Sequence, residues 1–593
     1  MIAADACVNS QSWDVDEDLV ESFLCVPTFQ FSSHLQSTIL QSSFGLEYRE
    51  AYEREVANTS LIAREAHKKT IYPYRLIRPD GISVETPSPC PNYVVVSYTW
   101  GRWKHRDRDL DTTVPGGYWQ IPANTLFSRQ DLDFAIRKIA GEEYAWVDVF
   151  CIPQLDSDPL HGQEIGRQSE IFRSATRAAV WLCSGGDEVL AEICSWVPEG
   201  PTMMDPVTVP FPSLYEIKHG TADLEEFRRR AKLVASLTEA VPWTTSLWTL
   251  QEAALRLDAV FYDKKGEPIR HRGSNNALTI NHLVKTLQYV NDSLRIACGP
   301  NWEGGAWMSE EINTSILEPP ESLPITEADV KLWLEAIDAV TRINLHKLNS
   351  MNASELLLTS THRTCKRPHD RVYGIMGAIG VTIPVDYTMD PAKVMERFIV
   401  ELHNTLPAEI QSFFRSPNRC PSQMAWLADE SCFSLGLVRQ GDSPSPRVFD
   451  SISPSGCLVV KYIHIISKAG LDDLASRFLG QRLAAGFDVV ALSETSCGLV
   501  QPRGMGSGRS AYILTCVILR LLHSRMKLAL VPLGSIVGLD RLMWKYMYLL
   551  LASDIKVEQL SPLRERSFRR IGVIFSGEEL RLDEAASGEF SIR

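Results

Sequence analysis

Four short apolar runs, separated by helical patterns, constrain the fold of this 593-residue chain more than any other feature. The runs show no polar alternation, which is typical of strands buried on both faces of a parallel sheet. They are residues 93–98, 144–152, 178–182 and 259–262. The helices between them are expected at residues 128–140, 163–175 and 246–255. Strands that alternate with helices call for parallel crossover connections, so we expect an open, doubly wound α/β sheet.

The helix expected at 128–140 is the clearest of these elements. Apolar residues recur in it at i, i+3, i+4 and i+7, so one face should pack on the sheet. Ser128 is expected to cap its N-terminus and Gly141 to end it.

The length of the chain predicts more than one domain, because single hydrophobic cores stop growing at roughly 250 to 300 residues. We expect an N-terminal lead-in, the α/β domain, a mainly helical region and a mixed α+β C-terminal domain with a helix-rich end. These segments are residues 1–85, 86–265, 266–405 and 406–593.

Composition excludes several classes of function. The net charge of -13 and pI near 5.6 argue against a nucleic-acid surface, which needs a concentrated basic face. The apolar stretch 512–539 contains Arg and Lys and is a poor membrane span, and the first residues do not form a secretory signal. Thirteen cysteines without paired CxxC spacing indicate reduced thiols and no metal site, so we expect a cytoplasmic protein.

Polar residues follow the first two strands, where an open parallel sheet binds its ligands. After the first strand these candidate ligand-binding residues are Ser97, Tyr98, Trp100 and Gly101. After the second they are Asp148, Cys151 and Gln154. Asp148 is either a structural hydrogen-bond acceptor or a residue that orients a ligand. Cys151 is either a small buried side chain or a nucleophile, although no partner histidine is evident.

The densest candidate is the segment Trp243 to Glu252 (WTTSLWTLQE). On a helix, Trp248, Gln251 and Glu252 stand at i, i+3 and i+4 and share one face, where they could bind the hydroxyls of a sugar and stack on a flat ring. The alternative is equally concrete, because Thr249 and Glu252 have the spacing of a capping box.

Four ordered motifs resemble those of the fungal heterokaryon incompatibility (HET) domain. They are YVVVSYTWG at 93–101, YAWVDVFCIPQ at 144–154, QSEIFRSATRAAVWL at 168–182 and WTTSLWTLQE at 243–252. Residues 363–377 (RTCKRPHDRVYGIMG) and 385–387 look like an element that commonly follows in these proteins. We expect Arg363, Asp370 and Arg371 to form a salt-bridged junction between this element and the sheet.

The resemblance implies a role in fungal non-self recognition that ends in programmed cell death. The HET domain is in turn similar to TIR domains, which have a flavodoxin-like parallel sheet, act in innate immunity, and in many cases cleave NAD+ at the nicotinamide glycosidic bond. Their glutamate lies in a Ser-x-Trp-Cys-x-x-Glu pattern, which Ser246, Trp248 and Glu252 match here, with Thr249 in place of the cysteine.

This resemblance makes Glu252 the candidate catalytic residue and NAD+ a candidate substrate, with no cofactor and no metal. Glu252 would hold the nicotinamide-side ribose and stabilise the charge that develops as nicotinamide leaves. The alternative is a non-catalytic module that associates with itself or with another incompatibility protein. A glycine-rich segment at 504–510 is either a plain loop or a nucleotide-binding turn, and it lacks the lysine of a P-loop.

Overall fold

The computed structural model describes most of the chain between residues 71 and 415 and a set of segments after it. The described ranges are 71–99, 103–108, 111–197, 223–298, 326–348, 351–415, 432–434, 439–441, 447–467, 483–487, 528–537, 546–553, 566–576, 578–580 and 585–592, with a few single residues near them.

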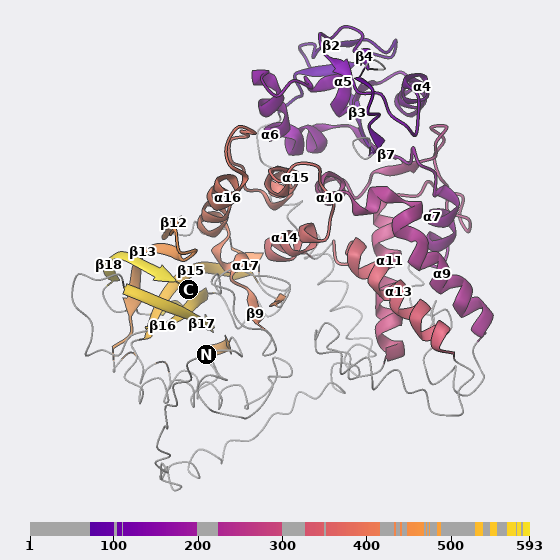
Figure 1. The fold of residues 1–593 in the computed structure, drawn as a ribbon. Helices are drawn as coiled ribbons and strands as arrows, with labels where there is room; N and C mark the ends of the chain where they lie inside the picture. The colour runs from indigo at the N-terminus through magenta and orange to yellow at the C-terminus, as the bar shows by residue number, and fades with distance from the viewer. Residues whose placement is uncertain are drawn as a thin grey trace, which may run out of the picture.

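A mixed six-stranded sheet forms the centre of the first part of the chain, at the top of Figure 1. Its strands are β1 (Arg75–Ile77), β2 (Ser83–Glu85), β3 (Tyr93–Ser97), β6 (Tyr144–Trp146), β7 (Arg177–Trp181) and β8 (Val260–Tyr262). They lie in the order β2-β1-β6-β3-β7-β8. The hairpin β1–β2 precedes residue 86 and still belongs to this sheet, with β1 antiparallel to β6. A separate two-stranded ribbon consists of β4 (Thr112–Thr113) and β5 (Gln120–Ile121).

The four predicted strands are the parallel part of this sheet. β3 pairs in parallel with β6 and β7, and β7 pairs in parallel with β8. All five residues of β3 are buried, as expected for a central strand without polar alternation. Numbered along the chain, the four strands lie in the order 2-1-3-4, and the order reverses between β3 and β7. The carboxyl end of β3 is therefore the place where such sheets bind ligands.

The helices of this part largely match the prediction. They are α4 (Arg129–Ala140), α5 (Asp148–Cys151), α6 (Pro159–Ser174), α7 (Asp187–Cys194), α9 (Leu224–Ala240) and α10 (Leu247–Leu255), with a 3₁₀ turn, η5 (Pro242–Thr245), before α10. The Ser128 side chain caps α4 through a capping box with Asp131, and Gly141 ends it with φ 62°. A cap of this kind contributes about 1 kcal/mol.

The predicted second strand, 144–152, is wrong in its second half. The strand β6 ends at Trp146, and a turn of helix, α5, begins at Asp148. The Asp148 carboxylate accepts a hydrogen bond from the Val149 N–H at 2.7 Å, which favours the helical turn. A short apolar run does not reveal whether it is strand or helix, and this one is divided between the two.

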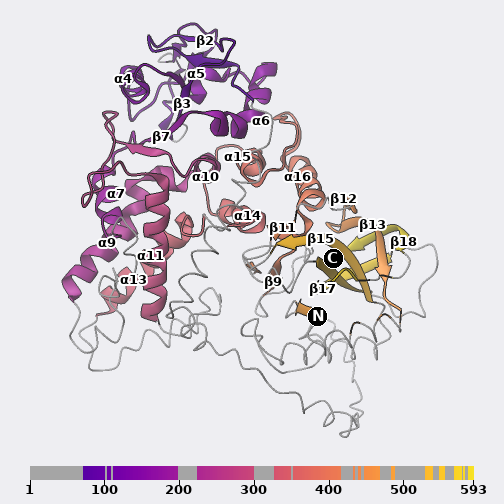
Figure 2. The same ribbon diagram turned by 180° about the vertical axis from the view of Figure 1, so that it is seen from behind.

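A bundle of long helices stands beside the sheet, at the right of Figure 1, and the reverse view shows the same grouping (Figure 2). It contains α7, α9, α11 (Ile280–Cys298) and α13 (Glu327–Ile343). α9 packs along α13, and Arg228 on α9 donates two hydrogen bonds to the Asp329 carboxylate on α13, at 2.6 and 2.8 Å. This forked geometry links two segments that are 101 residues apart.

Helices after residue 350 return the chain to the first sheet. They are α14 (Ala353–Thr361), α15 (Asp370–Ile379), α16 (Pro391–Thr405) and α17 (Pro407–Ile410). α15 packs against α10 and α6, so the element that follows the HET motifs is part of the same hydrophobic core.

The junction predicted at Arg363, Asp370 and Arg371 exists, but it is not a salt bridge between these residues. The Arg363 guanidinium is 1% exposed and donates to two carbonyls, Ser246 O at 3.1 Å and Ile343 O at 2.7 Å. Ile343 ends α13, and the partial negative charge of a helix C-terminus stabilises a buried cation. Arg371 likewise donates to a carbonyl at 2.8 Å, that of Ser360 near the end of α14.

The described residues after 439 form an eight-stranded, mainly antiparallel sheet. Its strands are β11 (Arg439–Gln440), β12 (Phe449–Ile452), β13 (Leu458–Ile465), β14 (Leu483–Phe487), β15 (Leu528–Val537), β16 (Tyr546–Ser553), β17 (Arg566–Ser576) and β18 (Ala585–Ile592), and a separate pair consists of β9 (Phe413–Arg415) and β10 (Cys432–Ser434). Five of them close into a ring, β13-β15-β16-β17-β18, because β13 pairs with both β15 and β18. A ring of five strands must contain a parallel pair, which is β17 and β18.

The predicted helix-rich end is wrong for the described residues from 528 to 592, which are strands. Runs such as 546–553 (YMYLLLAS) are continuously apolar, and periodicity does not distinguish a short strand of this kind from a buried helix. Side chains of α16 and α17 enter the core of the ring, which joins the helical region to it.

Candidate functional site

Glu252 on α10 faces the carboxyl end of β3. The hydroxyl of Ser97, the last residue of β3, donates a hydrogen bond to the Glu252 carboxylate. The same hydroxyl oxygen accepts a hydrogen bond from the Trp243 indole nitrogen at 2.7 Å. The indole, hydroxyl and carboxylate thus form a short chain of hydrogen bonds from η5 through β3 to α10.

The surroundings of Glu252 favour its neutral form. Its side chain is 8% exposed, and burial raises its pKa to about 8. The Ser97 hydrogen bond opposes this rise, whereas the charge of Asp148 adds to it. Gln168 on α6 donates to the other carboxylate oxygen at 3.5 Å. A carboxyl with a strongly raised pKa at the edge of a parallel sheet is one mark of a functional site, and buried structural carboxyls share it.

The capping-box alternative for Thr249 and Glu252 is wrong. α10 begins after Ser246, and the Thr249 hydroxyl donates to the carbonyls of Trp243 and Ser246 at 2.5 and 2.9 Å. Glu252 therefore lies in the interior of the helix, directed at β3 rather than at its own N-terminus.

Asp148 lies close enough to this group to affect it electrostatically. It is half-buried at the start of α5, and it raises the pKa of both Glu252 and Tyr98. Its hydrogen bond from the Val149 N–H fits the structural interpretation of this residue, and a role in orienting a ligand stays a prediction.

The other residues after the strands have mainly structural contacts. Tyr98 is buried, with its ring 6.2 Å from that of Phe127 and 5.9 Å from that of Trp181, centroid to centroid. Cys151 is fully buried, and burial raises the pKa of its thiol, which makes it a poor nucleophile. The Gln154 amide donates to the Ile152 carbonyl at 2.9 Å.

The three residues expected on one face of α10 have different neighbours. Gln251 is buried, and its side-chain oxygen accepts a hydrogen bond from the Gly377 N–H on α15 at 3.0 Å. Trp248 is half-buried and lies close enough to Asp370, also on α15, to oppose the rise that burial causes in the pKa of that carboxyl. Glu252 alone is turned toward the sheet. α15 thus occupies the side of α10 that was predicted to bind a ligand through Gln251.

Three contributors to this site were missed in the sequence: Gln168, Trp243 and Asp370. Gln168 and Trp243 stand inside the matched motifs, and their place in those motifs was the available signal. Asp370 reaches α10 from more than a hundred residues away, and no local pattern reveals such a contact.

Two predicted site residues and one predicted segment lie outside the described residues. Trp100, Gly101 and the glycine-rich segment 504–510 are outside the described ranges. Within those ranges, no group of His, Cys, Asp or Glu is arranged to hold a metal ion. No helix in the described part of the chain is long and apolar enough to span a bilayer.

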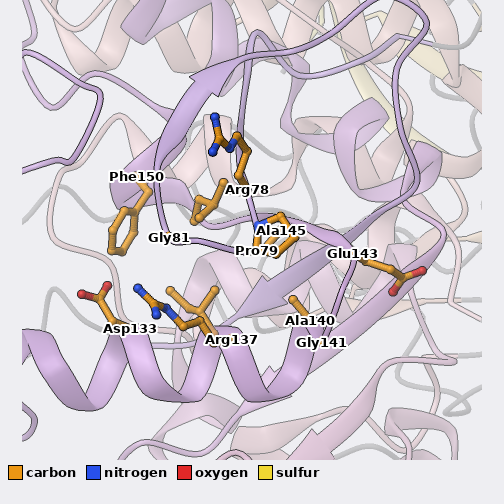
Figure 3. Close-up of a pocket in the computed structure, with 12 residues that line it drawn as sticks. Arg78, Pro79, Gly81, Asp133, Arg137, Ala140, Gly141, Glu143, Ala145 and Phe150 are labelled. Atoms are coloured by element: carbon orange, nitrogen blue, oxygen red, sulfur yellow. The ribbon is translucent and has the colours of Figure 1, made fainter.

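A shallow pocket, partly open to solvent and with room for no more than about one water molecule, lies between α4 and the β1–β2 hairpin (Figure 3). Its charged lining side chains make contacts within the protein: Arg137 donates to the Asp80 carbonyl at 3.0 Å, and Arg78 pairs with the Asp80 carboxylate. The pocket does not include Glu252 or any other predicted site residue.

Comparisons with known proteins point to one family. Residues 93–252 match the family model described as heterokaryon incompatibility protein (HET). A similar curated protein is heterokaryon incompatibility protein 6, OR allele, of Neurospora crassa, 26% identical over 200 residues. The match covers 29% of this chain and 29% of that protein, so the chain spans less than a third of its relative's length. No solved structure matches the chain.

Proposed function

Since residues 93–252 match the heterokaryon incompatibility family model, we propose that this protein is an effector of fungal non-self recognition and programmed cell death, acting in the cytoplasm. We further propose that its α/β domain cleaves NAD+ at the nicotinamide glycosidic bond, with Glu252 as the catalytic residue. The observation that carries this proposal is the Ser97–Glu252 hydrogen bond at the carboxyl end of β3.

The topology of the sheet supports the proposal. The parallel strands lie in the order 2-1-3-4, which is the order of the first four strands in a flavodoxin-like sheet. Ser97 stands beside the point where the order reverses. TIR domains are expected to share this arrangement, and the Ser246, Trp248 and Glu252 spacing matches their glutamate motif. Membership in a fold does not by itself establish chemistry, so the argument depends on the site.

The proposed reaction breaks the bond between the ribose C1′ and the nicotinamide nitrogen. The bonding electron pair leaves with nicotinamide, water adds to C1′, and the products are nicotinamide, ADP-ribose and a proton. Ionised Glu252 would hold the ribose hydroxyls, in exchange for its contact with Gln168, and stabilise the positive charge that develops on the sugar. Trp248 would support the ligand from the preceding turn of α10.

The raised pKa of Glu252 makes the proposal pH-dependent. If the ionised form is required, activity rises with pH and levels off above about 8, the pKa of this group. A glutamate with an ordinary pKa would already be ionised near neutral pH, so activity would not rise further with pH above neutrality.

The direct test is release of nicotinamide from NAD+ by the purified full chain, dilute and after clustering. We expect the Glu252→Gln variant to lose roughly 100-fold or more in rate, whereas Glu335→Gln, an exposed control on α13, retains full activity. Absence of turnover by the unaltered protein under both conditions would refute the enzymatic proposal.

A non-catalytic signalling module is the second candidate, and the enclosure of Glu252 favours it. The side chain is 8% exposed, and both its oxygens have partners within the protein. This candidate predicts that Glu252→Gln still triggers cell death in a fungal host, and that the protein acts by associating with itself or with another incompatibility protein.

A further inference from the structure

The chain of hydrogen bonds at Glu252 has a fixed direction. An indole N–H can only donate, so the 2.7 Å bond between the Trp243 nitrogen and the Ser97 hydroxyl makes the hydroxyl oxygen the acceptor. The hydroxyl has one hydrogen of its own, which it directs at Oε2 of Glu252. Trp243 is therefore the first donor of the chain, and Oε2 of Glu252 is its last acceptor.

Reversal of the bond between Ser97 and Glu252 is unfavourable. If a proton on Oε2 donated to Ser97, the hydroxyl hydrogen of Ser97 would need another acceptor. Ser97 is 4% exposed, and among the described residues its hydroxyl has no acceptor besides Glu252. A buried donor without a partner is costly, so Ser97 donates to Oε2 in both protonation states of Glu252.

Two contacts hold the indole that begins this chain. Trp243 in η5 is 2% exposed, and its ring meets that of Phe261 on β8 edge to face, with 5.6 Å between the centroids. Its carbonyl accepts a hydrogen bond from the Thr249 hydroxyl on α10 at 2.5 Å. The indole is thus fixed to the sheet and to the helix that carries Glu252, and it holds the Ser97 hydroxyl by its oxygen.

The other carboxyl oxygen, Oε1, has a neighbour that suits either protonation state. This neighbour is the side-chain amide of Gln168 on α6, whose nitrogen lies 3.5 Å from Oε1. An amide has an NH₂ donor and a carbonyl acceptor, and half a turn of the group exchanges them. The donor suits an ionised Oε1, and the carbonyl suits an Oε1 that carries a proton. Gln168 therefore accommodates the gain and loss of a proton at Oε1.

The charge that acts on the carboxyl comes from α5. The neighbours on β3, η5 and α6 are a hydroxyl, an indole and an amide, which are all neutral. Asp148 at the start of α5 favours the protonated form of Glu252, and the Tyr98 phenol after β3 is affected by both carboxyls. α15 packs on the Gln251 side of α10. Asp148 thus favours a proton on Glu252, and the hydrogen bonds decide which oxygen carries it.

We propose that Trp243 and Ser97 are positioning residues that reserve Oε2 of Glu252 and leave Oε1 as the oxygen that carries the proton and receives a ligand. A ribose hydroxyl donates to ionised Oε1 and displaces the Gln168 amide, while Oε2 stays bound to Ser97. The placement of the proton stands by itself, and the identity of the ligand rests on the proposed function.

Infrared spectroscopy of the full chain tests where the proton resides. The C=O band of a neutral carboxyl lies at lower frequency when its carbonyl oxygen accepts a hydrogen bond, and Glu252→Gln identifies the band by removing it. We expect a lowered band in the unaltered protein, because Ser97 donates to Oε2. Ser97→Ala should raise the frequency and strengthen proton binding roughly tenfold, so that the band persists to higher pH. A band that Ser97→Ala leaves unchanged would overturn the inference.

Trp243→Phe tests the role of the indole and keeps an aromatic ring beside Phe261. We expect changes in the same directions as in Ser97→Ala but smaller, because the indole polarises and holds the hydroxyl. In a Ser97→Ala background the same substitution should have no further effect, since the indole acts through the hydroxyl. A further change there would assign the effect to packing and overturn the positioning role. Trp333→Phe, which removes a buried indole on α13, is the matched control and leaves the band unchanged.

ADP-ribose, which carries the ribose and lacks the scissile bond, tests the ligand part. It should lower the pH at which the band disappears, by the same factor in the unaltered protein and in Ser97→Ala, because it binds the ionised carboxylate at Oε1. No change, or a larger one in Ser97→Ala, would overturn the assignment of the ligand to Oε1. Band shifts as expected in a chain that never cleaves NAD+ would support the proton placement and refute the enzyme.

The converse outcome separates the two proposals as well. NAD+ cleavage by a chain whose Glu252 band is unaffected by Ser97→Ala would refute the positioning role and leave the enzyme standing.

Discussion

Replacing Glu252 by glutamine should stabilise the α/β domain at neutral and alkaline pH. Glutamine has nearly the same shape and cannot ionise, so the variant mimics the neutral carboxyl that burial favours. The effect follows from proton linkage: a carboxyl whose pKa is higher in the folded state binds an extra proton on folding, between its unfolded and folded pKa values.

The size of the effect follows from the two pKa values. The ordinary value for glutamate is 4.5, and the folded value is about 8. Below pH 4.5 the carboxyl is neutral in the folded and unfolded states, so it does not change the free energy of unfolding. As the pH rises, the unaltered protein loses ~1.4 kcal/mol per pH unit relative to the variant, about 3 kcal/mol by pH 7 and about 5 kcal/mol above pH 8, as an upper bound.

Hydrogen exchange is the appropriate assay, because a chain with several structural parts does not unfold in one step. The opening free energy of the amides in β3 and α10 is measured from pH 5 to pH 9, after correction for the intrinsic exchange rates. We expect protection in the unaltered protein to fall with pH up to about 8 and that in Glu252→Gln to stay level. Glu335→Gln on α13 should behave as the unaltered protein does.

Parallel pH profiles for the unaltered protein and Glu252→Gln would refute this reasoning. They would mean that Glu252 is already ionised in the folded protein, as an exposed carboxylate is. Its burial and its hydrogen bond with Ser97 would then not control its charge.

Three further predictions concern the surroundings of the site. Asp148→Asn should lower the pKa of Glu252, and the same exchange profiles should show the fall in protection ending at a lower pH. Gly377→Ala should weaken the packing of α15 on α6 and destabilise it by about 1 to 3 kcal/mol, because a Cβ there would lie 2.4 Å from the Ser169 Cβ. Faster limited proteolysis near residue 380 would show this. Arg363→Lys should lower the thermal unfolding midpoint, because one ammonium cannot reach both carbonyls and a buried carbonyl left without a donor costs about 1 to 3 kcal/mol. An unchanged midpoint would contradict the role of Arg363 in the junction.

The parallel part of the first sheet could be predicted because its signals are local. Each strand is a short apolar run, and the cap at Ser128 and the stop at Gly141 mark their helix within a few residues. A general rule about parallel sheets and the family motif pointed to Ser97 and Glu252 as candidate residues. The hydrogen bond between them and the raised pKa of Glu252 could not be predicted, because both depend on how distant residues pack around the carboxyl.

What could not be predicted depends on contacts between distant residues. The Gln251 side chain looks free on a helical wheel, but the Gly377 N–H, 126 residues away, binds it. The apolar pattern of residues 144–152 is compatible with one long strand and equally with a short strand followed by a turn of helix. The strands after residue 528 close on β13, more than sixty residues earlier, and no short window of sequence contains both sides of that pairing.

The closed ring of five strands can form only after its last strand has been synthesised. β18 lies between β13 and β17, although it is the most distal of the five along the chain. The ring therefore stays open on the ribosome until residues 585–592 have emerged, and a nascent chain that stalls earlier displays two unpaired strand edges. Such edges recruit other chains, so premature termination in this region should yield aggregates or substrates for degradation rather than a stable shortened protein.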